Sequence, residues 1–195
     1  MIEQHQLPVN LLADLLSAFA QDVEKTRDAE GYADRAELLD YCRRSANPVG
    51  RLLLHLYGVS DAQALQQSDA ICTALQLANF WQDLSVDIPR GRHYLPRADC
   101  AAYGACQAEL LARQTTPQNA RLIQDSADWA RALMVQGAPL VHSLPGRMGW
   151  ELRLVVQGGL RILDKVDALQ GGSLHTRPRL HAPDWIVMLA RAVAM

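Results

Sequence analysis

Apolar residues recur at three- and four-residue steps along most of this chain, which is the spacing that brings side chains onto one face of an α-helix. The first stripe predicts an amphipathic helix over about residues 8–25. Residues 28–35 hold four charged side chains and a glycine without apolar periodicity, so we expect a loop there. No segment alternates apolar and polar residues as a strand does, and the pattern therefore predicts an all-α helical bundle.

A second stripe covers residues 35–56 and contains Pro48. Proline removes one backbone hydrogen bond of a helix and clashes with the preceding turn. We therefore expect either a kink near residues 44–48 or two helices that simply meet there. Gly58 follows this stripe as a C-cap.

A third stripe predicts a long helix that has Ser60 as its N-cap and extends to about Val86, where Pro89 and Gly91 stop it. Short helical pieces are expected over 99–113. The later stripes predict three more helices, with irregular segments between them: 117–141, 150–166 and 184–195.

The composition supports this fold class and limits the partners. A length of 195 residues allows one domain with a sizeable core, so we assign residues 1–195 to a single domain. Apolar residues make up 49% of the chain, which favours helices packed on helices. A formal net charge of −2 argues against a nucleic-acid partner. The four cysteines have no C-x-x-C spacing, so we expect reduced thiols rather than a zinc site.

The N-terminus, MIEQHQLPVN, has neither the basic nor the apolar region of a secretory signal, and no run of about eighteen apolar residues is present. We therefore expect a cytoplasmic protein, at most peripheral to the inner membrane. The final helix is expected to pack on the protein, with contact to a membrane surface as the alternative. We interpret His55 as a core histidine and residues 175–181 as a solvated loop. The tryptophans are also expected in the core: Trp81, Trp129, Trp150 and Trp185.

Candidate chemistry gathers at the end of the third helix, where Asn79, Asp83 and Asp87 follow one another at four-residue intervals. Residues four apart lie on one face of a helix, so three oxygen-bearing side chains form a ridge of about 12 Å. Mg²⁺ favours one or two carboxylates, with waters and substrate phosphates in its other positions. The pattern predicts a magnesium–diphosphate site. Phosphate-binding donors follow directly: Arg90, Arg92 and His93.

Acid pairs at this spacing also occur by chance on solvated helix faces, so the surroundings of the ridge matter. The helix around it is otherwise apolar, and Asn79 extends the row. Like charges four apart near a helix C-terminus repel each other and oppose the helix dipole, and a cation would remove both penalties. A metal–diphosphate mouth on an apolar helical body suits a lipophilic diphosphate and the carbocation that its ionisation leaves.

Two long segments resemble the squalene/phytoene synthase family. QLANFWQDLSVDIPRGRHYLP, residues 76–96, is similar to the second aspartate-rich motif of that family, and YCRRSANPVGRLLLHLYG, residues 41–58, is similar to its Tyr-Cys box. LPGRMGWELRLVVQGGLRILDKV, residues 144–166, resembles the hopanoid-pathway branch called squalene or hydroxysqualene synthase. The resemblance covers nearly the whole chain from about residue 8.

The resemblance implies an isoprenoid-synthase fold, Mg²⁺ as cofactor and a prenyl diphosphate as substrate. Asp83 and Asp87 would hold Mg²⁺ with Asn79 beside them. The other matched residues would serve the substrate: Gln76 lining the cleft, Tyr41 facing the reacting centre, and Arg92 contacting the diphosphate. Partner enzymes of the same pathway are a further expectation.

Two departures from the family pattern favour one branch of the chemistry. Gln82 stands where many condensing members have arginine, and Ser45-Ala46-Asn47 replaces Val-Ala-Gly. More polar groups near the cation would help to place a water. We therefore expect ionisation of presqualene diphosphate and capture of the cation by water to give hydroxysqualene, with head-to-head condensation of two farnesyl diphosphates as the alternative.

The family also carries a first aspartate-rich motif well upstream of the Tyr-Cys box. Glu24/Asp28 and Glu30/Asp34 have the spacing but lie too close to that box, in a charged segment. We therefore expect that the chain lacks the N-terminal helices of the family, together with half of its metal ligands. A third hypothesis follows, in which the chain is an inactive protein that binds a prenyl chain or a partner.

Overall fold

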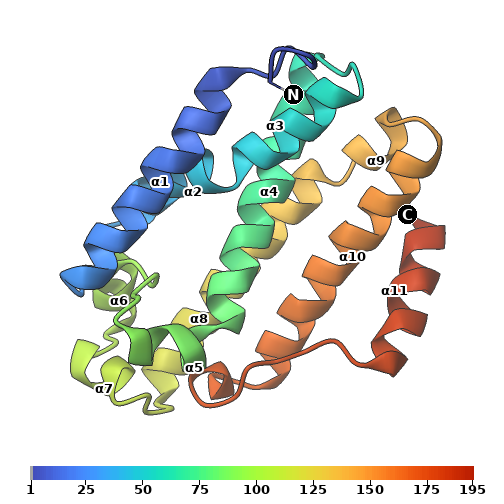
Figure 1. The fold of residues 1–195 in the computed structure, drawn as a ribbon. Coiled ribbons are helices and arrows are strands. Elements are labelled where there is room, and N and C mark those ends of the chain that lie inside the picture. Colours follow the sequence, from blue (N-terminus) through green and yellow to red (C-terminus); the bar gives the residue numbers. More distant parts are fainter. Residues whose placement is uncertain (1) are drawn as a thin grey trace.

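The computed structural model describes residues 2–195, and in this range every regular element is helical (Figure 1). The all-α prediction is confirmed. None of these helices is long and apolar enough to cross a bilayer. The α-helices are α1 Val9–Arg27, α2 Arg35–Ser45, α3 Asn47–Leu56, α4 Ala62–Gln82, α5 Leu84–Asp87, α6 Arg97–Tyr103, α7 Gln107–Leu111, α8 Pro117–Gly137, α9 Leu140–Ser143, α10 Gly146–Ala168 and α11 Ala182–Ala194, with 3₁₀ turns η1 Ile88–Arg90 and η2 Gly172–Leu174.

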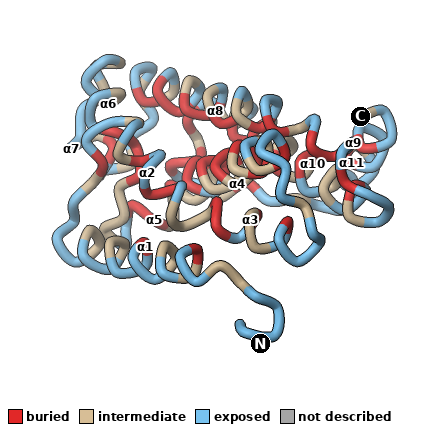
Figure 2. The backbone as a smooth tube through the Cα atoms, turned by 90° about the horizontal axis from the view of Figure 1, so that it is seen from above, coloured by how far each residue is buried: buried red, intermediate tan, exposed pale blue. Residues whose placement is uncertain are grey.

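Helices α4 and α8 pack against each other at the centre of the molecule, and α3 and α10 pack on α4 (Figure 1). The buried residues concentrate on this central pair (Figure 2). A Cβ atom on Gly137 would lie 2.5 Å from the carbonyl oxygen of Gln67 and 2.6 Å from Ile71 Cγ1. Glycine at that position therefore lets the end of α8 approach α4 closely.

The Tyr-Cys box forms two helices that meet at Ala46, which decides between the two alternatives for Pro48. Pro48 lies in the first turn of α3, where a missing backbone N–H costs no helical hydrogen bond. The buried Asn47 Oδ1 accepts a hydrogen bond of 2.9 Å from Thr73 Oγ1, which ties α3 to α4. The box is therefore anchored to the central helix.

Two boundaries differ from the sequence prediction. Asp61, and not Ser60, caps α4 by accepting a hydrogen bond from Ala64 N. The predicted long helix also stops at Gln82 rather than continuing to Val86. The chain breaks at Asp83, resumes as α5 and η1, and turns at Gly91 in the left-handed region.

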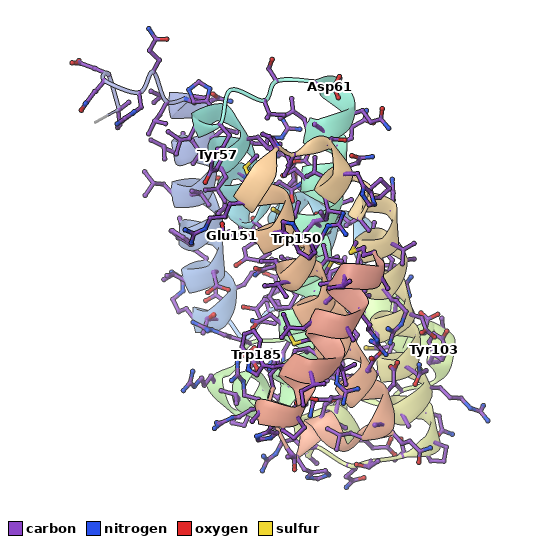
Figure 3. All side chains as sticks on the ribbon, turned by 90° about the vertical axis from the view of Figure 1, so that its right-hand side faces the viewer. Tyr57, Asp61, Tyr103, Trp150, Glu151 and Trp185 are labelled. Carbon is purple, nitrogen blue, oxygen red and sulfur yellow. The ribbon has the colours of Figure 1, made fainter. Side chains whose placement is uncertain are left out.

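Several residues that we expected in the core lie at the surface. His55 is exposed, and its Nε2 lies 3.0 Å from the carbonyl oxygen of His5. Trp81 is fully buried, but Trp150 and Trp185 are each about half exposed, on the side of the molecule formed by α10 and α11 (Figure 3). Trp129 is partly buried beneath the Arg35 guanidinium, 4.6 Å from its ring centroid. The core prediction was therefore wrong for His55, Trp150 and Trp185.

Candidate active site

The ridge of Asn79, Asp83 and Asp87 keeps its register although the helix breaks within it. Asp83 N donates to Asn79 O at 2.9 Å, and Asp87 N donates to Asp83 O at 2.8 Å. The ridge therefore runs from the surface into the protein: Asn79 is exposed, the Asp83 side chain is 15% exposed, and Asp87 is buried.

Asp87 is an acid held in an unfavourable place. Burial raises its pKa, and the neighbouring Asp83 carboxylate raises it further, while Arg92 acts in the opposite direction. Arg92 Nη1 lies 3.8 Å from Asp87 Oδ1, so the turn after η1 does bring this arginine beside the ridge. Arg92 Nε is buried and has no hydrogen-bond partner among the described residues. A buried donor without a partner in the protein is available to hydrogen-bond a ligand.

Asp22 of α1 belongs to the same cluster, and the sequence analysis did not single it out. Its carboxylate accepts a hydrogen bond of 2.9 Å from Tyr94 OH and lies 3.5 Å from Arg92 Nη2. The available signal was its position, because Asp22 follows Leu11 and Ala18 on the face of α1 that turns inward. An acid on a buried helix face marks either a paired structural charge or a site.

Tyr41 lies in an aromatic cluster at the wall of this site. Its ring centroid is 6.3 Å from that of Phe80 and 6.4 Å from that of Tyr94, and Phe80 and Tyr94 stack at 3.7 Å. Burial raises the pKa of Tyr41, and the nearby Asp22 carboxylate raises it further. The Tyr41 phenol therefore stays protonated at neutral pH and can donate a hydrogen bond.

The basic segment 175–181 is only in part the solvated loop that we expected: His175, Arg179 and His181 are exposed, but Arg177 and Pro178 contact the protein. Arg177 donates to both carboxylate oxygens of Asp83, through Nε to Oδ1 and through Nη2 to Oδ2 at 3.2 Å. Gln82 Nε2 donates to the carbonyl oxygen of Pro178 at 2.7 Å, and Pro178 is buried. The segment therefore folds back over the end of α4, and Arg177 neutralises one end of the ridge.

An apolar cavity of about 310 Å³ opens between α3, α4, α9 and α10. Ser68, Cys72 and Leu75 line it from α4, and at the same spacing this face continues to Asn79 and Asp83. Gln76 lies on the helix between the cavity lining and the ridge and is partly buried. The start of the polar ridge therefore continues the face of the central helix that lines the apolar cavity.

A second cavity of about 430 Å³ lies beneath the turn after η1 and is lined in part by Leu84, Ile88, Arg97 and Cys100. None of the ridge carboxylates lines it. It is larger than the apolar cavity, and its lining includes His93, one of the donors that the sequence analysis named, together with Tyr94. No residue of the ridge lines the apolar cavity either.

The donor set of the ridge fits Mg²⁺. Two carboxylates and one amide agree with the few protein ligands that Mg²⁺ takes when waters and phosphates complete its shell. The partial burial of Asp83 and Asp87 and their mutual repulsion also favour a cation between them. Within residues 2–195 there is no group of three or more His, Cys, Asp or Glu side chains that would form a complete protein cage for a metal.

The all-helical fold, with an acid ridge beside an apolar cavity, defines an isoprenoid-synthase type of protein. The family model described as "Squalene/phytoene synthase" matches residues 1–185. The chain belongs to the squalene/phytoene synthase family.

Individual proteins of this family are similar to the chain over most of its length. The hydroxysqualene synthase of Sinorhizobium fredii is 33% identical over 195 residues, which cover 100% of this chain and 64% of the relative. The hydroxysqualene synthase of Rhodopseudomonas palustris is 35% identical over 156 residues, or 79% of this chain and 52% of the relative. The crystal structure of squalene synthase HpnC from Alicyclobacillus acidocaldarius superposes with a TM-score of 0.81 at 38% identity, over 87% of this chain and 63% of that one. The chain thus spans less than two thirds of these proteins.

Proposed function

We propose that this protein acts in isoprenoid biosynthesis on presqualene diphosphate: it ionises the substrate with Mg²⁺, and water captures the cation to give hydroxysqualene. The observation that carries the proposal is the face of α4 that lines the apolar cavity with Ser68, Cys72 and Leu75 and continues to Asn79, from which backbone hydrogen bonds lead on to Asp83 and Asp87. The names of the two relatives above, both hydroxysqualene synthases, support the choice of reaction.

Asp83 and Asp87, with Asn79 beside them, would hold the metal. Bound Mg²⁺ neutralises a diphosphate and makes it a better leaving group. Arg177 pairs with Asp83, so the Arg177 guanidinium would have to leave this carboxylate when Asp83 binds a cation. The guanidinium could then pair with a diphosphate bound to that cation.

Arg92, Tyr41 and Gln76 would bind and orient the substrate. Arg92 has long contacts to its two acids and an unpaired Nε, so it retains donors for a diphosphate oxygen. Tyr41 would donate a hydrogen bond to the diphosphate or stabilise developing charge near the reacting centre. The apolar cavity would hold the prenyl chain and keep bulk water away from the cation.

Head-to-head condensation of two farnesyl diphosphates is the second candidate. A phytoene synthase, that of Pseudescherichia vulneris, is 28% identical over 96% of this chain, so the relatives include an enzyme of another name. The contacts of two polar residues also weaken the argument for capture by water. Gln82 donates to Pro178, and Asn47 accepts from Thr73, so both have structural partners. Their polarity therefore gives less support to placement of a water than the sequence alone suggested.

The test is incubation with presqualene diphosphate and Mg²⁺, with products separated by gas chromatography and mass spectrometry. Hydroxysqualene and released diphosphate are expected, and neither should form without Mg²⁺. A parallel incubation with farnesyl diphosphate reports condensation. Prenyl diphosphate binding without diphosphate release in either reaction would contradict both enzyme proposals and favour the third hypothesis, an inactive binding protein.

A further inference from the structure

Helix α11 buries one side and leaves an apolar side exposed. Met188 and Ala192 are buried against the protein. The adjoining side carries large apolar side chains that are 51–72% exposed: Trp185, Ile186, Leu189 and Val193. We call these four residues the α11 face. Scattered single apolar residues are normal on a surface, whereas a contiguous row of them often marks an interaction site, and the surroundings of the row decide what it binds.

Tryptophans stand at both ends of the α11 face (Figure 3). Trp185 lies in the first turn of α11. Trp150 of α10 lies near its other end, because Arg153 stacks on the Trp150 ring at 5.1 Å and donates to the carbonyl oxygen of Ala192 at 3.1 Å. Tryptophan is enriched at the level of lipid headgroups, where its ring is apolar and its N–H remains wet.

The exposed charged side chains on α11 and on the segment before it have one sign, although Glu151 on α10, the residue after Trp150, is also exposed. The preceding segment, HTRPRLH, is basic and contains no acid, and His175, Arg179 and His181 are exposed. The single acid of residues 175–195 is Asp184, which is buried and paired with Arg161 at 2.8 Å and Lys165 at 2.9 Å. An anionic surface would therefore meet cations beside an apolar helix and no exposed acid on that helix or segment.

We propose that the α11 face docks onto the surface of a bilayer that contains anionic lipid. The helix of 13 residues, about 20 Å long, would lie flat, with Trp185, Ile186, Leu189 and Val193 among the acyl chains and Arg179 at the headgroups. The match to the family model ends at residue 185, so most of this face lies outside it. The face contains no residue of the proposed active site.

Vesicle flotation tests the proposal, with vesicles of phosphatidylcholine and phosphatidylglycerol and with vesicles of phosphatidylcholine alone. We expect binding to the anionic vesicles and much less to the neutral ones. The double variant Ile186→Glu/Leu189→Glu should lower the partition coefficient by about tenfold or more, because two exposed apolar side chains become charged. Quenching of tryptophan fluorescence by brominated lipid should fall in Trp185→Phe.

Helix α1 offers a matched control, because its apolar stripe is equally exposed: Leu16 is 70% and Val23 is 68% exposed. Unlike α11, this helix also carries the acids Asp14 and Glu24, which an anionic surface would repel. Leu16→Glu/Val23→Glu should bind vesicles like the unaltered protein, and Arg179→Glu should weaken binding where Arg121→Glu on α8 does not. Equal losses in the α1 and α11 variants, or no vesicle binding at all, would overturn the proposal. So would a dimer in light scattering without lipid that Ile186→Glu/Leu189→Glu abolishes, because the face would then bind a second copy.

Discussion

Two clusters of charged side chains in this protein differ in how closely their partners approach. Between α10 and α11, Arg161 and Lys165 reach Asp184 at 2.8 and 2.9 Å, and His181 N donates to the same carboxylate at 2.7 Å. At the ridge, Arg92 stays 3.8 Å from Asp87, and its Nε has no partner among the described residues. The first cluster is complete in itself, whereas the second retains unused donors.

The pKa values of the two acids separate in the same way. The hydrogen bond from the His181 backbone, helped by Lys165, holds the pKa of Asp184 well below its usual range. Burial and the Asp83 carboxylate raise the pKa of Asp87. The protein thus stabilises the charged form of Asp184 and destabilises the charged form of Asp87. A destabilised charged form is typical of groups that bind or react. The raised pKa alone does not mark a site, because burial also raises that of Asp167 in its ion pair with Arg131; at Asp87 it coincides with the unpaired Arg92 Nε.

The sharpest way to break this comparison is the same change in both clusters. Asp83→Asn should weaken Mg²⁺-dependent binding of inorganic pyrophosphate by about 100-fold, because a direct ligand is lost, and should change Tm little. Asp184→Asn should leave that binding unchanged and lower Tm by several degrees, because Arg161 and Lys165 lose their buried partner. Isothermal titration calorimetry and thermal circular dichroism measure the two effects. If Asp83→Asn instead melts sharply lower and binds unchanged, the ridge is structural.

Arg92 should contribute the next largest effect. Arg92→Lys removes the forked donor set and should reduce pyrophosphate affinity in the presence of Mg²⁺ by about tenfold, while keeping the charge. Arg121→Lys, at an exposed position of α8, is the control and should have no effect. Equal affinities for the two variants would show that Arg92 serves only its ion pairs with Asp22 and Asp87.

Asp87 gives a pH-dependent prediction. Its pKa is raised in the folded protein, so between the unfolded value and the folded one the native state binds more protons, and stability falls as pH rises through that window. Without Mg²⁺ at pH 7, Asp87→Asn should therefore raise Tm by about 2–4 °C, as about 1 kcal/mol does in a chain of this size. At pH 4 the gain should shrink. A lower Tm for the variant at pH 7 without metal would contradict the unfavourable placement of this charge.

The smallest expected effect concerns Arg177. Because its guanidinium pairs with Asp83, a divalent cation has to displace it. Arg177→Gln should raise the affinity for Mg²⁺ alone by about threefold, the scale of a partly exposed ion pair. Titration of both proteins with MgCl₂ in a calorimeter tests this, and weaker Mg²⁺ binding by the variant would rule out competition at Asp83.

Local periodicity was sufficient for most of the fold but not for the assembly of the site. The stripes predicted the main helices, and the backbone hydrogen bonds from Asp83 to Asn79 and from Asp87 to Asp83 continue at four-residue steps across the break at Asp83. Asp22 and Arg177 were missed because they meet their partners across 72 and 94 residues of sequence. Contacts at that separation depend on how helices pack, which a helical period does not encode.

The exposed tryptophans show the same limit. Trp150 and Trp185 fit apolar stripes, and a stripe does not say whether its helix is covered on one side or on two. The predicted N-cap of α4 was wrong by one residue, because the adjacent Ser60 and Asp61 are both good capping residues and the structure uses Asp61.

The pairing of Arg177 with Asp83 also has a fixed place in the order in which contacts form during translation. Asp83 is translated 94 residues before Arg177, so a nascent chain presents the acids of the ridge before the segment that folds over them exists. N-terminal parts of a chain fold first as they leave the ribosome. The end of α4 therefore stays open until residue 177 has left the ribosome, and Arg177 can neutralise it only after α4 and α8 have been made.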